Sequence, residues 1–348
     1  MLLNLVLVAS LIALTGWFLL VGRAILLPVF AAIISVYVLV SATEALIKLP
    51  VVRSFPMIVI RIIVVAVFAM IIFTFTVVIS ATIRDISAVA PTYQANLNAL
   101  LDGLAIYLDL EANELWAQID AMTFDRIDLP KLVLGLLGGF TSLGGTFFLI
   151  IIYTGFLMGE RETFDRKIAA AFPEKGLAEA LLTVISQINE QIRSYITMKT
   201  LINIMLGSIS YCILWLMGID FALFWALMIG FLNYIPYVGS YVAVAFPVLI
   251  SLAQFGDLAK TALLAILLAG LQMFIGNILE PRMIGRQLNL SPFVVLVSLS
   301  VWTALWGLPG AILAVPLTSI FVIIAASFDA TRPAAVLLSD RVGPLAPG

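Results

Sequence analysis

The sequence predicts an all-α membrane protein with about eight bilayer-spanning helices. Of its 348 residues, 63% are hydrophobic and only 11% are charged. The mean hydropathy is +1.17, and several apolar stretches approach the ~20 residues that a helix needs to cross a bilayer. This composition is typical of a polytopic membrane protein and argues against a soluble enzyme. The apolar stretches are residues 2–22, 24–43, 57–80, 139–158, 201–218, 221–235, 238–255, 259–279, 292–306 and 310–328.

The sequence lacks the motifs of several chemical classes. It contains no histidine and a single cysteine, Cys212, and it has no C-x-x-C, H-E-x-x-H or phosphate-binding G-x-x-x-x-G-K-[ST] motif. We therefore expect no metal site, no cofactor, no direct ATP coupling and no catalytic residue. The net charge of −2 also argues against a nucleic-acid partner, which requires a basic face.

Residues 1–80 are expected to form three N-terminal spans. The first apolar stretch lacks the basic start of a secretory signal, and a second stretch follows Arg23, so we interpret the first as a retained span. Lys and Arg then set the orientation. Nine of them lie in residues 44–61 and 159–200, which we assign to the cytoplasm together with both termini and the tail, residues 331–348.

Residues 81–138 form an insertion that we assign to the outside, because it holds eight acids and only three basic residues. Apolar residues recur there every three or four positions, which predicts one amphipathic helix that extends from the third span. Packing on neighbouring helices and a gating or partner-binding role both stay open for it. The recurring residues are Ile86, Val89, Tyr93, Leu97, Leu100, Leu104 and Leu108.

Residues 139–200 are expected to contain the fourth span and a cytoplasmic amphipathic connector. Two G-x-x-x-G pairs, at 135/139 and 155/159, favour close helix packing in lipid, within one chain or between chains. The connector has an apolar seam from Ala178 to Tyr195 that is too short to predict a coiled coil. It indicates a helix that lies on the cytoplasmic ends of other spans or contacts another subunit.

Residues 201–330 form the expected transport region, in which two helices are broken. The stretch between Asp220 and Asp257 has arms of about 15 residues, which cover ~22 Å and do not cross a bilayer. We therefore predict one re-entrant hairpin that enters from outside and a second, of opposite orientation, that enters from inside after Ser291. Backbone groups exposed at such tips bind solutes in secondary transporters. The predicted tip residues are Pro236, Gly239, Gly307, Pro309 and Gly310.

Glu280 is the one acid that we expect deep within this region. An ionised carboxylate at the bilayer centre costs ~2.5–3.5 kcal/mol on insertion scales, so it normally pairs or lines a cavity. Two interpretations stay open: a salt bridge with Arg282 or Arg286 at the membrane surface, or a role in solute binding or proton coupling. Asn203 has a similar ambiguity between hydrogen bonding across helices and solute contact.

Several motifs resemble those of the autoinducer-2 exporter family of bacterial membrane transporters. They are NYIPYVGS at 233–240, GNILEPRMIG at 276–285, LSP at 290–292 and GLPGAILAVPL at 307–317, while SYITMKT at 194–200 and AVLLSD at 335–340 resemble the branch that exports the signal itself. The resemblance implies export of autoinducer-2, a small hydroxylated molecule, across the bacterial inner membrane. It also implies an elevator-like movement and a homo-oligomer, with a pentamer suggested. Other members are similar to sodium or lithium/proton antiporters.

The residues favour a polar organic solute over a cation. A polyhydroxylated solute needs several neutral donors and acceptors, because each unpaired polar group in a dry site costs ~1–3 kcal/mol. An antiporter instead needs exchangeable acids near the midplane, and these are scarce here. Antiport, an uncoupled channel or facilitator, and a non-transport scaffold stay open as alternatives. The candidate substrate-binding residues are Asn203, Asn233, Tyr237, Ser240, Gln272, Asn277 and Glu280.

Overall fold

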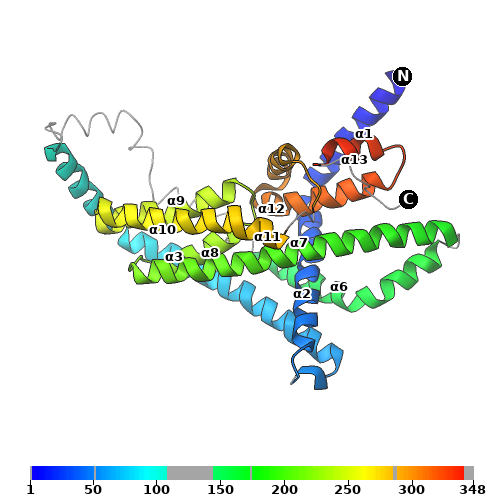
Figure 1. The fold of residues 1–348 in the computed structure, drawn as a ribbon, viewed down its shortest axis with the longest axis horizontal. Coiled ribbons are helices and arrows are strands. Elements are labelled where there is room, and N and C mark those ends of the chain that lie inside the picture. Colours follow the sequence, from blue (N-terminus) through cyan, green and yellow to red (C-terminus); the bar gives the residue numbers. More distant parts are fainter. Residues whose placement is uncertain (1, 51, 108–143, 173–174, 285–287, 341–348) are drawn as a thin grey trace. The chain divides into compact units, whose positions relative to one another are not determined.

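A computed structural model describes residues 2–50, 52–107, 144–172, 175–284 and 288–340. Every regular element in these ranges is a helix (Figure 1), which confirms the predicted all-α class. Within the same ranges, six helices are long and apolar enough to cross a bilayer, and shorter apolar helices cover Ala9–Val21 and Ala222–Leu232. The chain is therefore a multi-pass membrane protein.

The chain divides into two compact units, each built from separated segments. Unit 1 comprises Met1–Ala69, Thr146–Leu201 and Glu280–Gly348, and unit 2 comprises Met70–Gly145 and Ile202–Leu279. Two of the boundaries fall inside the long helices α3 (Met57–Tyr107) and α7 (Lys175–Leu216). The linear division into functional segments made from the sequence stays a prediction.

Unit 1 contains a small apolar core where α2 (Arg23–Ile47), α3 and α6 (Gly144–Ala171) meet. Leu39, Ile60, Val64 and Met158 form its buried centre. The long helix α12 (Pro292–Ala326) packs against α1 (Leu2–Val21), α2 and α13 (Arg332–Leu338). The remaining described elements of the unit are η1 (Val52–Ser54) and α11 (Glu280–Ile284).

Helix α12 is a helical hairpin. Gly307 has non-helical dihedrals, φ 65° and ψ −144°, and Trp302 Nε1 donates a hydrogen bond to Thr318 Oγ1 at 3.1 Å. In a straight helix these two residues would be ~24 Å apart, so the chain reverses between them. The reversal is tight, because a Cβ on Gly310 would lie 2.0 Å from Trp302 O.

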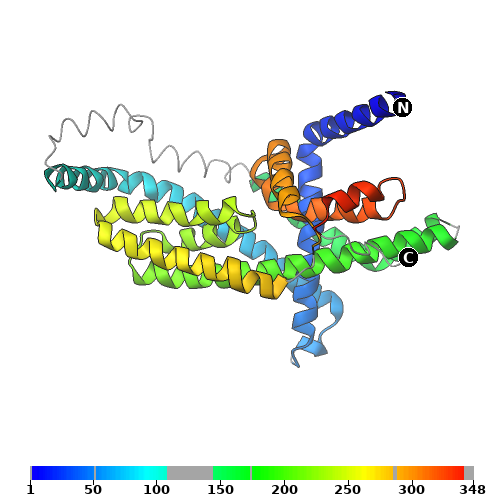
Figure 2. The same ribbon diagram turned by 45° about the horizontal axis from the view of Figure 1, so that its top comes forward.

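Unit 2 is organised around a second helical hairpin. It consists of α8 (Ala222–Leu232) and α9 (Val238–Phe255), followed by α10 (Leu258–Phe274) and the π-helical turn η2 (Ile275–Leu279). Helix α9 packs against both α8 and α10, and Figure 2 shows α9 and α10 running side by side. The break that separates α8 from α9 contains Pro236.

The third span continues into an extended helix, as predicted. Helix α3 has 51 residues, which at ~1.5 Å per residue is far longer than the bilayer core. Ile86 and Tyr93, from its predicted apolar seam, are buried. The rest of the predicted insertion, beyond Tyr107, lies outside the described residues.

Helices α6 and α7 cover nearly all of the described part of the 139–200 region. Helix α7 is continuous through 42 residues, so the predicted connector and the following span form a single helix. Gly135 and Gly139 lie outside the described residues. A Cβ on Gly155 or Gly159 would meet no atom within 4 Å, so this pair makes no close helix contact in the described part of the chain. Cys212, also on α7, is exposed.

Candidate functional site

Buried and half-buried polar side chains of unit 2 meet at Asn233, directly after the last residue of α8. Its carboxamide oxygen accepts hydrogen bonds from Gln272 Nε2 at 2.8 Å and from Ser240 Oγ at 3.2 Å. Its carboxamide nitrogen donates to Asn203 Oδ1 at 2.8 Å. Four of the predicted substrate-binding residues, from α7, α8–α9 and α10, therefore form one network. We call Asn203, Asn233, Ser240 and Gln272 the amide cluster.

Two glycines allow α7 and α8 to approach closely enough for this contact. A Cβ on Gly207 would lie 3.2 Å from Ala226 O, and a Cβ on Gly230 would lie 2.9 Å from Asn203 O. The helices therefore touch backbone to backbone, as small residues permit in lipid. Asn203 lies one helical turn before Gly207, and Asn233 lies about one turn after Gly230. The glycine crossing thus brings the two amides together.

The tip of the α8–α9 hairpin places Ser240 against Asn233. Val238 N donates to Pro236 O at 2.6 Å and closes a γ-turn, with Tyr237 at φ 59° and ψ −67°. This conformation is rare and strained for a residue with a side chain. Gly239 then packs so tightly that a Cβ would lie 1.9 Å from Leu232 O. Both features fix the direction in which α9 begins.

Two atoms of the amide cluster are buried without a hydrogen-bond partner among the described residues. They are Asn203 Nδ2, which is a donor, and Gln272 Oε1, which is an acceptor. Leaving such groups unpaired costs ~1–3 kcal/mol each, and native structures contain few of them. A solute that carries hydroxyl groups can satisfy both atoms, because a hydroxyl both donates and accepts.

The amide cluster is an uncharged site. Asn203 is 5% exposed and Asn233 is 2% exposed, and none of the four side chains is ionisable. In the described part of the chain, no group of three or more cysteine, aspartate or glutamate side chains is placed to hold a metal ion. The arrangement suits hydrogen bonding to a neutral polar molecule.

Three predicted site residues lie outside the amide cluster. Tyr237 is 50% exposed at the hairpin tip, and Asn277 is exposed in the π-helical turn. Glu280 belongs to unit 1, where its Oε1 atom lies 2.6 Å from Lys199 Nζ. The Lys199 side chain is 5% exposed and that of Glu280 is 27% exposed.

The ion-pair partner of Glu280 differs from the partners expected from the sequence. Glu280 pairs with Lys199, whereas Arg282, one of the two expected partners, is exposed and forms no ion pair with Glu280 among the described residues. Residues two apart on a helix do not face each other, which is the physical reason. The other expected partner, Arg286, lies outside the described residues. The sequence offers one indication of this role, because Lys199 is a single charge just before the apolar stretch 201–218.

Both acids that bracket the first hairpin have structural partners. Asp220 Oδ2 accepts a hydrogen bond from the Tyr93 hydroxyl at 2.8 Å, and the Asp220 backbone nitrogen donates to Gln254 Oε1 at 2.9 Å. Burial, followed by the hydrogen bond to Asp220 and its charge, raises the pKa of the Tyr93 hydroxyl. Asp257 accepts hydrogen bonds from two backbone N–H groups in the first turn of α10. Neither Tyr93 nor Gln254 was predicted to make polar contacts.

The chain is similar to bacterial transport proteins. The family described as AI-2E family transporter matches residues 5–329. The AI-2 transport protein TqsA of Escherichia coli (strain K12) is 30% identical over 275 residues, which is 75% of each chain.

Two further relatives match over shorter regions. A putative transport protein of Borreliella burgdorferi is 37% identical over 187 residues, 53% of this chain and 51% of the relative. The putative transport protein YhhT of E. coli (strain K12) is 42% identical over 126 residues, 36% of each chain. The chain thus spans about half or less of the length of these two relatives.

Proposed function

The chain belongs to the AI-2E transporter family, and on this premise we propose that it is a secondary transporter that exports autoinducer-2, a small hydroxylated signalling molecule. Transport, rather than an enzymatic reaction, is the activity of this family. A relative that is named as an AI-2 transport protein supports the choice of solute.

The observation that carries the proposal is the amide cluster. It presents neutral donors and acceptors in a buried position, and it keeps one donor, Asn203 Nδ2, and one acceptor, Gln272 Oε1, without partners among the described residues. A polyhydroxylated solute loses hydrogen bonds to water when it binds, and such donors and acceptors replace those hydrogen bonds. A metal cation would instead require carboxylate or carbonyl oxygens converging on one point.

A sodium or lithium/proton antiporter is the second candidate, and one observation favours it. Glu280 is a partly buried carboxylate held by Lys199, and ionisable pairs within spans often serve coupling. Asp220 and Asp257 do not add to this candidate, because both have structural hydrogen bonds. An uncoupled channel or facilitator would use the amide cluster without any coupling ion.

Counterflow in liposomes separates these candidates. Purified full-length chain is reconstituted, and uptake of labelled autoinducer-2 is measured beside sodium- or lithium-driven proton exchange. Export of autoinducer-2 predicts saturable counterflow that accumulates label transiently. Cation exchange without counterflow would support the antiporter, and flux that only follows the solute gradient and survives an uncoupler would support the facilitator.

Variants connect the flux to the amide cluster. Asn203→Leu and Gln272→Leu each remove one cluster contact and should reduce counterflow about five- to hundredfold, as expected from ~1–3 kcal/mol per lost buried hydrogen bond. Asn98→Leu is the matched control, since Asn98 is exposed on α3. Under the export proposal, Glu280→Gln should leave autoinducer-2 counterflow intact, because Glu280 pairs with Lys199 outside the amide cluster. Under the antiporter alternative, the same variant should abolish cation exchange. Wild-type counterflow in both cluster variants would contradict the proposed site.

The family resemblance supports three further parts of the proposal. We place the chain in the bacterial inner membrane with both termini in the cytoplasm, and we propose an elevator-like movement and a homo-oligomer, with five copies suggested. A C-terminal epitope should then bind antibody in inverted vesicles and not in intact spheroplasts. Binding in intact spheroplasts would reverse the orientation.

A further inference from the structure

Unit 1 contains a cavity of about 920 Å³ between α2, α6 and α7. This volume falls in the range that accommodates a drug-sized ligand. None of the residues that line it belongs to the amide cluster. The cavity is therefore a separate feature, and its ligand need not be the transported solute.

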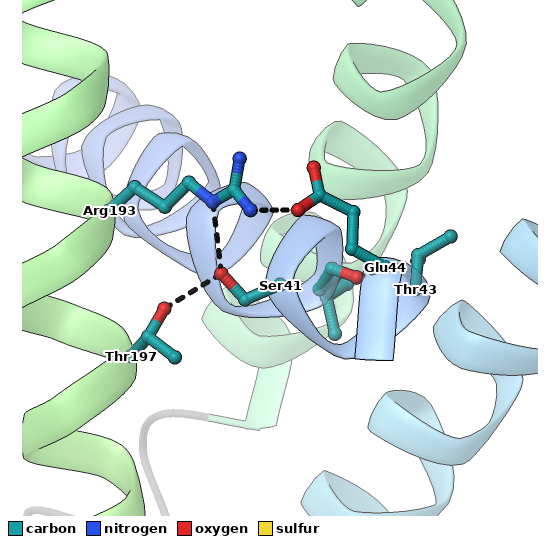
Figure 3. Close-up of polar contacts among 6 residues, drawn as sticks. Ser41, Thr43, Glu44, Arg193 and Thr197 are labelled. Atoms are coloured by element: carbon teal, nitrogen blue, oxygen red, sulfur yellow. Dashed lines mark hydrogen bonds and ion pairs between the residues drawn. The ribbon is translucent and has the colours of Figure 1, made fainter. Parts of the chain in front are cut away.

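One wall of the cavity is polar and has its hydrogen bonds satisfied. Figure 3 shows the Arg193 guanidinium of α7 reaching toward α2, where its Nε donates to Ser41 Oγ at 3.2 Å and another nitrogen pairs with Glu44. The hydroxyls of Ser41 and Thr197 are 2.7 Å apart. These contacts join α2 to α7 and occupy the charges of Arg193 and Glu44.

Four other charged residues line the cavity and remain unpaired. Lys48, Arg161, Asp165 and Glu190 form no ion pair or side-chain hydrogen bond with any residue that the structure describes. Two of them are cations and two are anions. A ligand that neutralises all four must carry charges of both signs.

The polarity of the cavity changes along its length. On α2 the lining begins with Ile33, Val36 and Val40 and ends with Glu44 and Lys48. These residues cover ~22 Å along the helix axis. Helix α2 is one of the helices able to cross a bilayer, and Lys48 follows its last residue. The apolar end therefore lies at the depth of acyl chains, and the charged end lies at the membrane surface.

We propose that this cavity binds one zwitterionic phospholipid with a phosphoethanolamine headgroup. The phosphate pairs with Lys48 and Arg161, the ammonium pairs with Asp165 and Glu190, and an acyl chain lies along the apolar part of α2. The membrane supplies this ligand directly, and no soluble zwitterion has the apolar chain that the other half of the cavity fits.

The charges also discriminate between lipids. The unpaired charges of the lining are two cations and two anions, because Glu160 pairs with Lys167 and Glu44 pairs with Arg193. The additional negative charge of an anionic lipid therefore finds no partner there. A choline headgroup has no N–H groups to donate to carboxylates, and it is usually held by a cage of aromatic rings. The aromatic side chains of the lining are only Tyr37 and Phe164.

Native mass spectrometry of the detergent-solubilised full-length chain tests the proposal. We expect one phosphatidylethanolamine per chain to bind at about tenfold lower concentration than phosphatidylglycerol or phosphatidylcholine, the discrimination typical of one charge-assisted hydrogen bond. The double variant Arg161→Ala/Asp165→Ala should lose this preference. Arg166→Ala/Glu179→Ala is its matched control, because it removes the same charges at exposed positions of α6 and α7 outside the cavity.

A second variant protects the test against a folding defect. Ile33→Trp fills the apolar part of the cavity without changing any charge and should reduce phosphatidylethanolamine occupancy about tenfold, as lost chain burial requires. Equal binding of all three lipids, or an unchanged preference in both cavity variants, would overturn the proposal. Full competition by water-soluble glycerophosphoethanolamine would overturn it as well, because the acyl chain would then contribute nothing.

Discussion

Replacing Gly239 by alanine tests whether the α8–α9 hairpin holds the amide cluster in place. The new methyl group would lie 1.9 Å from Leu232 O, whereas real Cβ atoms essentially never come closer than 3.0 Å to such a neighbour. The backbone must therefore move by about 1 Å, at a cost of ~1–3 kcal/mol. Because Ser240 Oγ already lies 3.2 Å from Asn233 Oδ1, the same movement breaks that hydrogen bond.

The expected result is a transport defect larger than the loss of stability explains. Counterflow of labelled solute in liposomes should fall about five- to hundredfold, because the distorted amide cluster loses ~1–3 kcal/mol of hydrogen-bonding free energy. The Tm in detergent should fall by a few degrees. Gly270→Ala on α10 is the matched control, since its Cβ would meet no atom within 4 Å and alanine favours the helix by up to ~1 kcal/mol. Wild-type flux and Tm in Gly239→Ala would refute the reasoning.

Three further predictions concern polar contacts outside the amide cluster. In denaturation measurements, Lys199→Ala should lower the free energy of unfolding by roughly 1–3 kcal/mol, which is less than for a fully buried pair because the Glu280 side chain is 27% exposed. Adding Glu280→Leu should recover part of this loss. If the effects of the two substitutions are purely additive, the two residues are not coupled. Since the folded chain raises the pKa of Tyr93, its hydrogen bond to Asp220 contributes fully below the unfolded pKa of ~10 and is lost only as pH rises through the higher folded value. The Tm difference between wild type and Tyr93→Phe should therefore be constant from about pH 6 to 9, and a change within this window would contradict the assignment. Asp257→Ala should cost ~1 kcal/mol of stability through the lost helix cap, and Asp257→Asn should retain most of it; equal losses in the two variants would argue against capping.

Much of the architecture is predictable because it depends on local composition. Apolar length identifies the spans, three- and four-residue spacing identifies the extension of α3, and Pro236 with Gly239 identifies the break between α8 and α9. The residues of the amide cluster can also be selected from the sequence, because isolated amides such as Asn203 and Gln272 are rare within apolar stretches and usually form hydrogen bonds across helices.

The remaining contacts depend on tertiary approach and leave little trace in sequence. Lys199 and Glu280 are 81 positions apart, and the nearby Arg282 is a more obvious but geometrically wrong partner. The crossing at Gly207 and Gly230 is equally hidden, since glycines that make no close contact, such as Gly155, look the same in the sequence.

The exposure of Cys212 offers a direct way to test the proposed homo-oligomer. It is the single thiol among 348 residues, and it is accessible on α7. A maleimide fluorophore therefore attaches to every chain once, without any engineered position. Counting photobleaching steps in single particles then counts subunits directly.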